Sequence, residues 1–222
     1  MSQHSTPILY GSCFSSAAFR VRLMLAWKNI EYENRFIDLQ NKDQVADLAK
    51  VNPSKRIPTF ITSEGKVLTQ SMAILEYLEE KYPERPCLPA DPIQRAITRE
   101  LCNEIGCDIH PIQNTGLAMQ LYDTRAEVVA WARKHIIKGF DALEAKLRSI
   151  REENYVPAES KYCVGDAVTM ADFFLVPQFY NAILYEVPLA PYPIIGSIHY
   201  HLKSIQEFID ASPERQSDYV QE

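Results

Sequence analysis

The N-terminal part of the chain alternates between short apolar runs and stretches with helical spacing. An apolar run from Ile8 to Tyr10 predicts a buried strand, closed by a glycine. Phe19, Leu23 and Trp27 then lie four residues apart, which predicts a helix with one apolar face. The pattern continues as a strand, a weak helix, a hairpin with glycine in its turn, and a further helix, at residues 32–38, 44–51, 58–68 and 72–78. The predicted order is β-α-β-α-β-β-α, which is an α/β layer on a mixed sheet.

A proline-rich segment separates this part from a helical remainder. Residues 83–89 hold three prolines and predict a semi-rigid linker. Beyond the linker the apolar residues have helical spacing, most clearly along one face of residues 129–147. Residues 149–161 are rich in charge and predict a solvated loop. Thr169 and Asp172 then have the spacing of a capping box, which predicts the start of another helix.

Length and composition fit two compact domains. The chain has 222 residues, of which 46% are hydrophobic and 23% are charged, and these proportions exclude a disordered or fibrous chain. No apolar stretch reaches the roughly 20 residues that a membrane-spanning helix needs. We predict an α/β domain over 1–84, a linker over 85–90 and an all-helical domain over 91–222.

Charge and cysteine content narrow the choice of partners and compartment. A net charge of −6 makes nucleic acid and anionic membranes poor partners. The five cysteines are scattered and lack the paired spacing of a metal site, so no bound metal is predicted. We interpret them as reduced thiols of a cytoplasmic protein.

Three dipeptides could carry chemistry, and each also has an ordinary structural explanation. Ser15-Ser16 precedes the first helix, where hydroxyls and free amides can hold an anion or a thiolate, although a serine at this place is also a common N-cap. Ile57-Pro58 opens a strand, where a cis peptide would turn the Ile57 backbone outward, although the trans form is the usual one. Gln70-Ser71 opens a helix, where Ser71 could simply act as the cap.

The order of these features resembles a known family. The α/β part is similar to the thioredoxin-like domain of glutathione transferases, and the linker and helical part are similar to that family's second domain. Residues 15–22, Ser-Ser-Ala-Ala-Phe-Arg-Val-Arg, resemble the signature of the zeta class, which includes maleylacetoacetate isomerase. Further segments that resemble this class lie at residues 52–59, 70–80, 110–114, 162–166 and 191–193. The resemblance implies a two-domain glutathione transferase fold, with a thioredoxin-like α/β domain and a C-terminal all-α domain.

The resemblance also implies roles for individual residues. The hydroxyl of Ser15 would contact the sulfur of glutathione, with Ser16 as the second candidate for the catalytic residue. The Ile57 backbone would pair with the cysteinyl unit of glutathione, and Gln70 with Ser71 would hold the γ-glutamyl end. The other implied glutathione-binding positions are Ala17, Gln44, Lys55, His110 and Asn114, of which Gln44 and Lys55 lie near positions that reach the glycyl carboxylate.

Three positions depart from the family pattern. A family cysteine is Ala17 here, and two arginines that are expected to hold substrate carboxylates are Phe14 and Leu184. These changes leave the glutathione side of the site complete and weaken its fit to an acidic second substrate.

The resemblance implies an enzyme that uses glutathione on a small electrophilic or cis-unsaturated substrate. Its activity would be that of a glutathione transferase, or of the maleylacetoacetate cis-trans isomerase of tyrosine and phenylalanine catabolism, and it would form a homodimer. One alternative is thiol–disulfide exchange by Cys13, because Cys13-Phe14-Ser15-Ser16 has the CxxS pattern near a helix start. Another is a non-catalytic module on the same fold.

Overall fold

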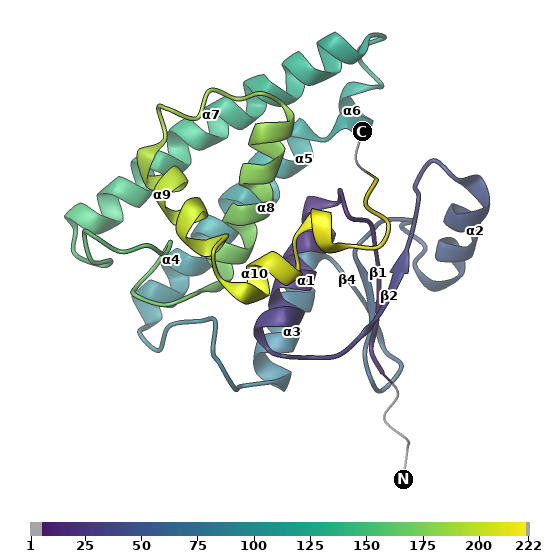
Figure 1. The fold of residues 1–222 in the computed structure, drawn as a ribbon, viewed down its shortest axis with the longest axis horizontal. Coiled ribbons are helices and arrows are strands. Elements are labelled where there is room, and N and C mark those ends of the chain that lie inside the picture. Colours follow the sequence, from purple (N-terminus) through teal and green to yellow (C-terminus); the bar gives the residue numbers. More distant parts are fainter. Residues whose placement is uncertain (1–5, 221–222) are drawn as a thin grey trace. The chain divides into compact units, whose positions relative to one another are not determined.

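The computed structural model describes residues 6–220 and divides them into two compact units (Figure 1). One unit combines residues 6–85 with residues 205–220, and the other is Pro86–Ser204. This division differs from the predicted domain boundaries at the C-terminal end, because the chain from residue 205 onward packs with the α/β unit. Residues 1–5 and 221–222 of the predicted domains lie outside the described part of the chain.

The α/β unit contains a mixed sheet with the strand order β2-β1-β3-β4. Its strands are β1 (Ile8–Gly11), β2 (Glu33–Phe36), β3 (Thr59–Ile61) and β4 (Val67–Thr69). β1 runs parallel to β2 and antiparallel to β3, and β3 and β4 form the antiparallel hairpin. The predicted strand and helix order of this unit is confirmed.

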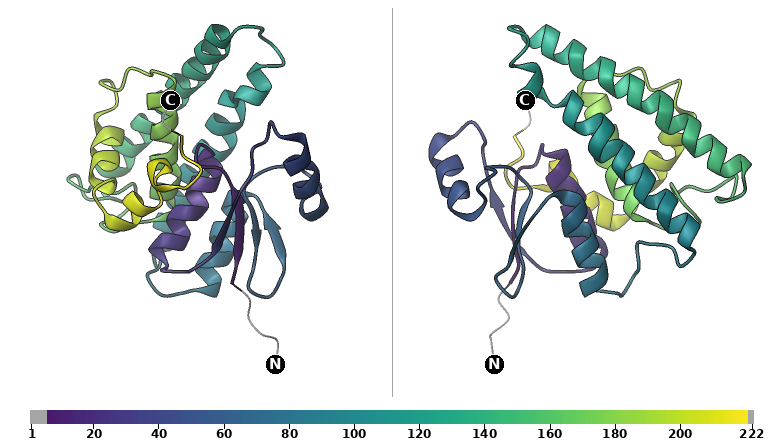
Figure 2. Two further views of the ribbon diagram at one scale, coloured as in Figure 1. Left: turned by 45° about the vertical axis from the view of Figure 1, so that its right-hand side comes forward. Right: turned by 180° about the vertical axis from the view of Figure 1, so that it is seen from behind.

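Helices cover both faces of this sheet because side chains alternate along β1. The helices of the unit are α1 (Ser16–Trp27), α2 (Lys42–Val51), α3 (Ser71–Lys81), α10 (Gln206–Asp210) and a short 3₁₀ turn at Pro213–Arg215. α1 and α3 lie side by side on one face (Figure 2), and α10 packs against α1. A Cβ at Gly11 would lie 3.1 Å from the Cβ of Ala18, so glycine lets α1 approach β1 closely. On the other face Leu48 of α2 packs with Tyr10 and Ile37.

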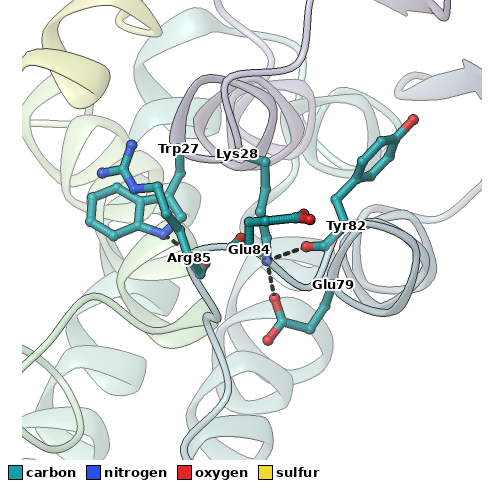
Figure 3. A network of polar contacts seen from close by, with 6 residues as sticks. All are labelled: Trp27, Lys28, Glu79, Tyr82, Glu84 and Arg85. Atoms are coloured by element: carbon teal, nitrogen blue, oxygen red, sulfur yellow. Dashed lines mark hydrogen bonds and ion pairs between the residues drawn. The ribbon is translucent and has the colours of Figure 1, made fainter.

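A fully buried lysine fixes the end of α1 to the chain that leaves α3 (Figure 3). The Nζ of Lys28 lies 2.7 Å from the Glu79 carboxylate, and the side chain of Lys28 is 0% exposed. Nζ also donates to the backbone carbonyls of Tyr82 and Glu84, at 2.7 and 3.1 Å. The preceding tryptophan donates its indole N–H to the carbonyl of Arg85, whose guanidinium lies 3.8 Å from the indole ring centre. The chain that enters the predicted linker is therefore held by side chains at the C-terminal end of α1.

The second unit is helical. Its helices are α4 (Pro92–Asn103), a π-helical segment (Glu104–Ile109), α5 (His110–Gln113), α6 (Thr115–Ala118), α7 (Arg125–Glu152), α8 (Met170–Leu184) and α9 (Pro193–Leu202). The apolar face predicted for α7 is buried, with Val128 at its first position in place of Val129. A side chain at Gly139 would collide with Ile109, so this glycine lets α7 pack against the π-helical segment. None of the helices between residues 6 and 220 has the length and apolar character needed to cross a bilayer.

Two local predictions for this unit have different outcomes. The loop predicted for residues 149–161 is wrong at its start, because α7 continues to Glu152 and the Arg151 guanidinium donates to the carbonyls of Leu147 and Tyr162. The capping box is confirmed. Asp172 accepts from the backbone N–H of Thr169 at 2.7 Å and from its hydroxyl at 3.1 Å.

Candidate active site

Ser15 occupies the N-cap of α1, and this position is compatible with catalysis. Its Oγ accepts from the backbone N–H of Ala18 at 3.2 Å, as an N-cap serine should. A hydroxyl that accepts through its oxygen keeps its own proton to donate, so Ser15 can cap the helix and also donate to a sulfur. The first turn, residues 16–19, is Ser-Ala-Ala-Phe and carries no acidic side chain to offset the positive helix end. Ser16 is buried at the first helical position, and Ala17 follows it half-buried.

Cys13, the nucleophile of the redox alternative, is poorly suited to form a thiolate. Its side chain is 2% exposed, and its Sγ–H donates to the carbonyl of Asp218 at 3.6 Å. Burial, together with the nearby Asp218 carboxylate, raises the pKa of the Cys13 thiol to about 11. Because the thiolate is the nucleophile in thiol–disulfide exchange, these properties argue against that alternative.

The Ile57-Pro58 peptide bond is cis. Ile57 is half-buried and precedes the strand ladder, which begins at Thr59. The segment is braced by Asn52, whose Nδ2 donates to the carbonyl of Arg56 and to the hydroxyl of Thr59, at 2.9 Å in each case. These hydrogen bonds hold the backbone on both sides of Ile57 and Pro58 in place at the start of β3.

The start of α3 differs from the simple serine cap that the sequence allows. Gln70, not Ser71, holds the N-cap position of α3, and no hydrogen bond from its exposed side chain caps the helix. Its backbone lies at φ 70° and ψ 115°, a conformation that side-chain-bearing residues rarely adopt. Ser71 is buried, and its Oγ accepts from the guanidinium of Arg20 at 3.2 Å. Arg20 therefore joins Ser71 to the helix that Ser15 begins.

Two further predicted residues lie elsewhere in the same unit. The carboxamide oxygen of Gln44 accepts from the backbone N–H of Asp38 at 2.8 Å, which leaves its NH₂ group available to a ligand. Lys55 is exposed, has a left-handed backbone with φ 54°, and donates its N–H to the carbonyl of Asn52.

His110 and Asn114 belong to the helical unit. His110 begins α5 directly after the π-helical segment, and π-helical turns are frequent at functional sites. Asn114 is the N-cap of α6, and its Oδ1 accepts from the backbone N–H of Gly116 at 2.9 Å. The structure therefore gathers the predicted residues into two groups, one in each unit.

The class of protein follows from this fold and from a family comparison. Residues 5–80 match the family described as "Glutathione S-transferase, N-terminal domain". A four-stranded α/β domain with serine at the start of its first helix, followed by a helical unit, is the architecture of a glutathione transferase.

Similar proteins define the class further. The chain is 40% identical to "Maleylacetoacetate isomerase" of Dictyostelium discoideum, over 98% of each chain, and 40% identical to that of Mus musculus, over 97% of this chain and 96% of the relative. A maleylacetoacetate isomerase of Anaeromyxobacter dehalogenans, solved with bound GSH in its active site, is 37% identical with a TM-score of 0.85, over 98% and 99% of the two chains. A zeta-class maleyl pyruvate isomerase gives a TM-score of 0.88 at 35% identity, over 96% of this chain and all of that structure. The chain belongs to the maleylacetoacetate isomerase family, the zeta class of the glutathione transferases.

Proposed function

We propose that this protein is a glutathione-dependent enzyme of the zeta type, acting as a maleylacetoacetate isomerase and as a glutathione transferase. The observation that carries the proposal is the Ser15 hydroxyl, which stands at the positive end of α1 with a proton left to donate. When bound, glutathione supplies a thiolate that can combine with an electrophile or catalyse cis-trans isomerisation by reversible addition to a double bond.

The residues of the α/β unit fit such a ligand. Ser15 would donate to the sulfur and favour its anion, with Ser16 as the second candidate and Ala17 beside them. The Ile57 backbone would pair with the peptide, and Gln70 with Ser71 would hold the γ-glutamyl end. The glycyl carboxylate would lie toward Gln44 and Lys55, and His110 and Asn114 would contribute from the helical unit.

The experiment that tests the function is a steady-state comparison at saturating glutathione. Turnover of maleylacetoacetate is measured beside turnover of generic electrophiles without carboxylates. Activity in either assay that depends on glutathione supports the proposal, and its absence from both contradicts it.

Isomerase activity on dicarboxylates is expected to be retained but weak, and apolar electrophiles are expected to be better second substrates. Phe14 and Leu184 are 57% and 58% exposed, so both present apolar surface where the family resemblance expects arginine. Moving a carboxylate from water into a site without a cationic partner costs desolvation free energy, and contacts with arginine usually offset this cost. We therefore propose that activity on apolar electrophiles is favoured over activity on diacids.

Introducing the two arginines should reverse this preference. Phe14→Arg combined with Leu184→Arg should raise kcat/KM for maleylacetoacetate, chiefly by lowering KM if the new contacts are made equally in the ground and transition states. Ile183→Arg is the matched control, since Ile183 neighbours Leu184 and is 52% exposed. An unmodified enzyme that already works on the diacid near the diffusional limit would show that other cations hold its carboxylates.

We also propose a cytoplasmic homodimer, by analogy with the family. Sedimentation at micromolar protein concentration should show a species of twice the chain mass of 25.4 kDa. A monomer as the sole species would refute this assembly.

A further inference from the structure

We propose that Asp218 is a positioning residue for Ser15, acting through the backbone of the turn that leads into α1. The inference rests on the proposed role of Ser15. Asp218 lies near the end of the described chain, which packs with the α/β unit.

The carbonyls of this turn are held from within the unit by one buried cation. Arg22 donates from Nη1 to the carbonyl of Ser12 at 3.0 Å and from Nη2 to that of Cys13 at 3.2 Å. Its Nε donates to the carbonyl of Ala211 at 3.0 Å, so the same guanidinium also holds the C-terminal segment. The Ser12 carbonyl additionally accepts from the N–H of Ser15 at 3.1 Å, which closes the turn.

One amide of the turn, that of Cys13, is held by Asp218. The backbone N–H of Cys13 donates to Asp218 Oδ2 at 2.8 Å, across a sequence separation of 205 residues. The neighbouring rings of Phe14 and Tyr219 are 5.6 Å apart between centres, so side-chain packing accompanies this hydrogen bond. Arg22 thus holds two carbonyls of the turn and Asp218 holds one of its amides, and loss of the acceptor would leave the turn free to shift.

The negative charge of Asp218 disfavours a thiolate near this turn. Asp218 is therefore proposed to act by positioning the backbone and not through its charge. The Asp218 carboxylate is one of the causes that raise the pKa of the Cys13 thiol. A thiolate near the turn would experience the same unfavourable field. Moreover, Asp218 Oδ1 is buried and has no hydrogen-bond partner among residues 6–220, so a single oxygen makes the contact that matters. The turn needs an acceptor for the Cys13 amide, and an uncharged acceptor should serve as well.

The experiment compares Asp218→Ala with Asp218→Asn in the full-length protein. Asp218→Ala should lower kcat for glutathione transfer to an uncharged electrophile by about tenfold, as expected for the loss of one hydrogen bond that positions the turn. The ultraviolet absorbance of the bound thiolate should titrate at higher pH in Asp218→Ala than in Asp218→Asn, because both variants remove the charge and only Ala removes the acceptor. KM for glutathione should stay within about twofold. Asp218→Asn keeps an oxygen acceptor and should retain kcat within about twofold of the unmodified enzyme. An Asn variant as impaired as the Ala variant would overturn the positional role.

A second variant of the same segment separates positioning from general stability. Gln216→Ala removes contacts to Asn34 and to the carbonyls of Asp210 and Ser212, and it leaves the Cys13 contact in place. It should lower the melting temperature without moving the thiolate titration. An equal titration shift in Gln216→Ala would overturn the proposal.

Combination with Ser15→Ala identifies which inference has failed. If Asp218 acts through Ser15, Asp218→Ala should add less than about twofold to the loss caused by Ser15→Ala. Full activity of Asp218→Ala beside a strong loss in Ser15→Ala would overturn the positioning role alone. Full activity of Ser15→Ala would remove the proposed role of Ser15, and the positioning role would fall with it.

Discussion

Replacing Ser15 with alanine should lower glutathione-dependent turnover by about 10- to 100-fold, because one hydrogen bond to a charged group is worth about 1.5–3 kcal/mol. The affinity for glutathione should change much less, since the proposed role of the hydroxyl is on the sulfur while other groups are proposed to hold the two ends of the peptide. Steady-state rates at saturating glutathione, with a separate binding measurement, check both expectations.

A glycine variant separates this effect from helix capping. Ser15 also caps α1 through the N–H of Ala18, and an N-cap serine replaced by alanine costs about 0.5–2 kcal/mol of stability, whereas glycine costs only a few tenths. Ser15→Gly should therefore lose the same activity as Ser15→Ala with a smaller drop in melting temperature. Full activity in both variants would transfer the role to Ser16 or Cys13, which Ser16→Ala and Cys13→Ala would then resolve.

Replacing Asp172 with alanine should lower the free energy of unfolding by about 1–3 kcal/mol, the cost of leaving a buried donor without its acceptor, which matches or exceeds the cost of losing an ordinary cap. Asp172 is fully buried and accepts from the Thr169 N–H, the Thr169 hydroxyl and the Cys163 N–H, the last at 2.9 Å. Alanine would leave these buried donors without an acceptor. Denaturant unfolding measures the change, and Asp166→Ala, in which an exposed acid of the same loop is removed, is the matched control. Lost activity at full stability would instead reveal a site where we find a cap.

The same residue should make stability depend on pH in a defined direction. Burial raises the pKa of Asp172 from 3.8 to about 6, against the opposing hydrogen bonds from Thr169 and Cys163. The folded state therefore binds this proton more tightly than the unfolded state does. The resulting stabilisation is present below the unfolded pKa and is lost as the pH rises through the folded pKa. The difference in stability between the unmodified protein and Asp172→Ala should thus be larger near about pH 4 than near about pH 7.

Local patterns were sufficient for the order of elements and for the position of Ser15. The spacing of Phe19, Leu23 and Trp27 defines α1, and a serine just before such a helix is an N-cap by ordinary chemistry. The capping box of α8 is likewise contained within four adjacent residues. Such features depend on neighbours in sequence, so one sequence is enough to predict them.

Contacts between distant parts of the chain could not be predicted in this way. No local signal in residues 205–220 indicates that they pack with the α/β unit, because that packing depends on partners such as Arg22 and Cys13, far away in sequence. Arg20 and Arg22 are both buried, although charged residues are most often exposed. Their hydrogen bonds to Ser71 and to the turn before α1 explain the burial, and only the folded chain contains those acceptors.

At Gln70, the residue type that would best stabilise the left-handed backbone differs from the one proposed to bind glutathione. At φ 70° a residue with a Cβ costs about 1–2 kcal/mol relative to its favoured conformations, and glycine would avoid this cost. Glycine, however, lacks the carboxamide that is proposed to hold the γ-glutamyl end. Evolution toward a more stable apo-protein would therefore remove affinity for glutathione at this position. A ligand that binds only the folded state stabilises it by mass action. At high ligand concentration this stabilisation offsets the cost of the strained backbone, so the residue can persist.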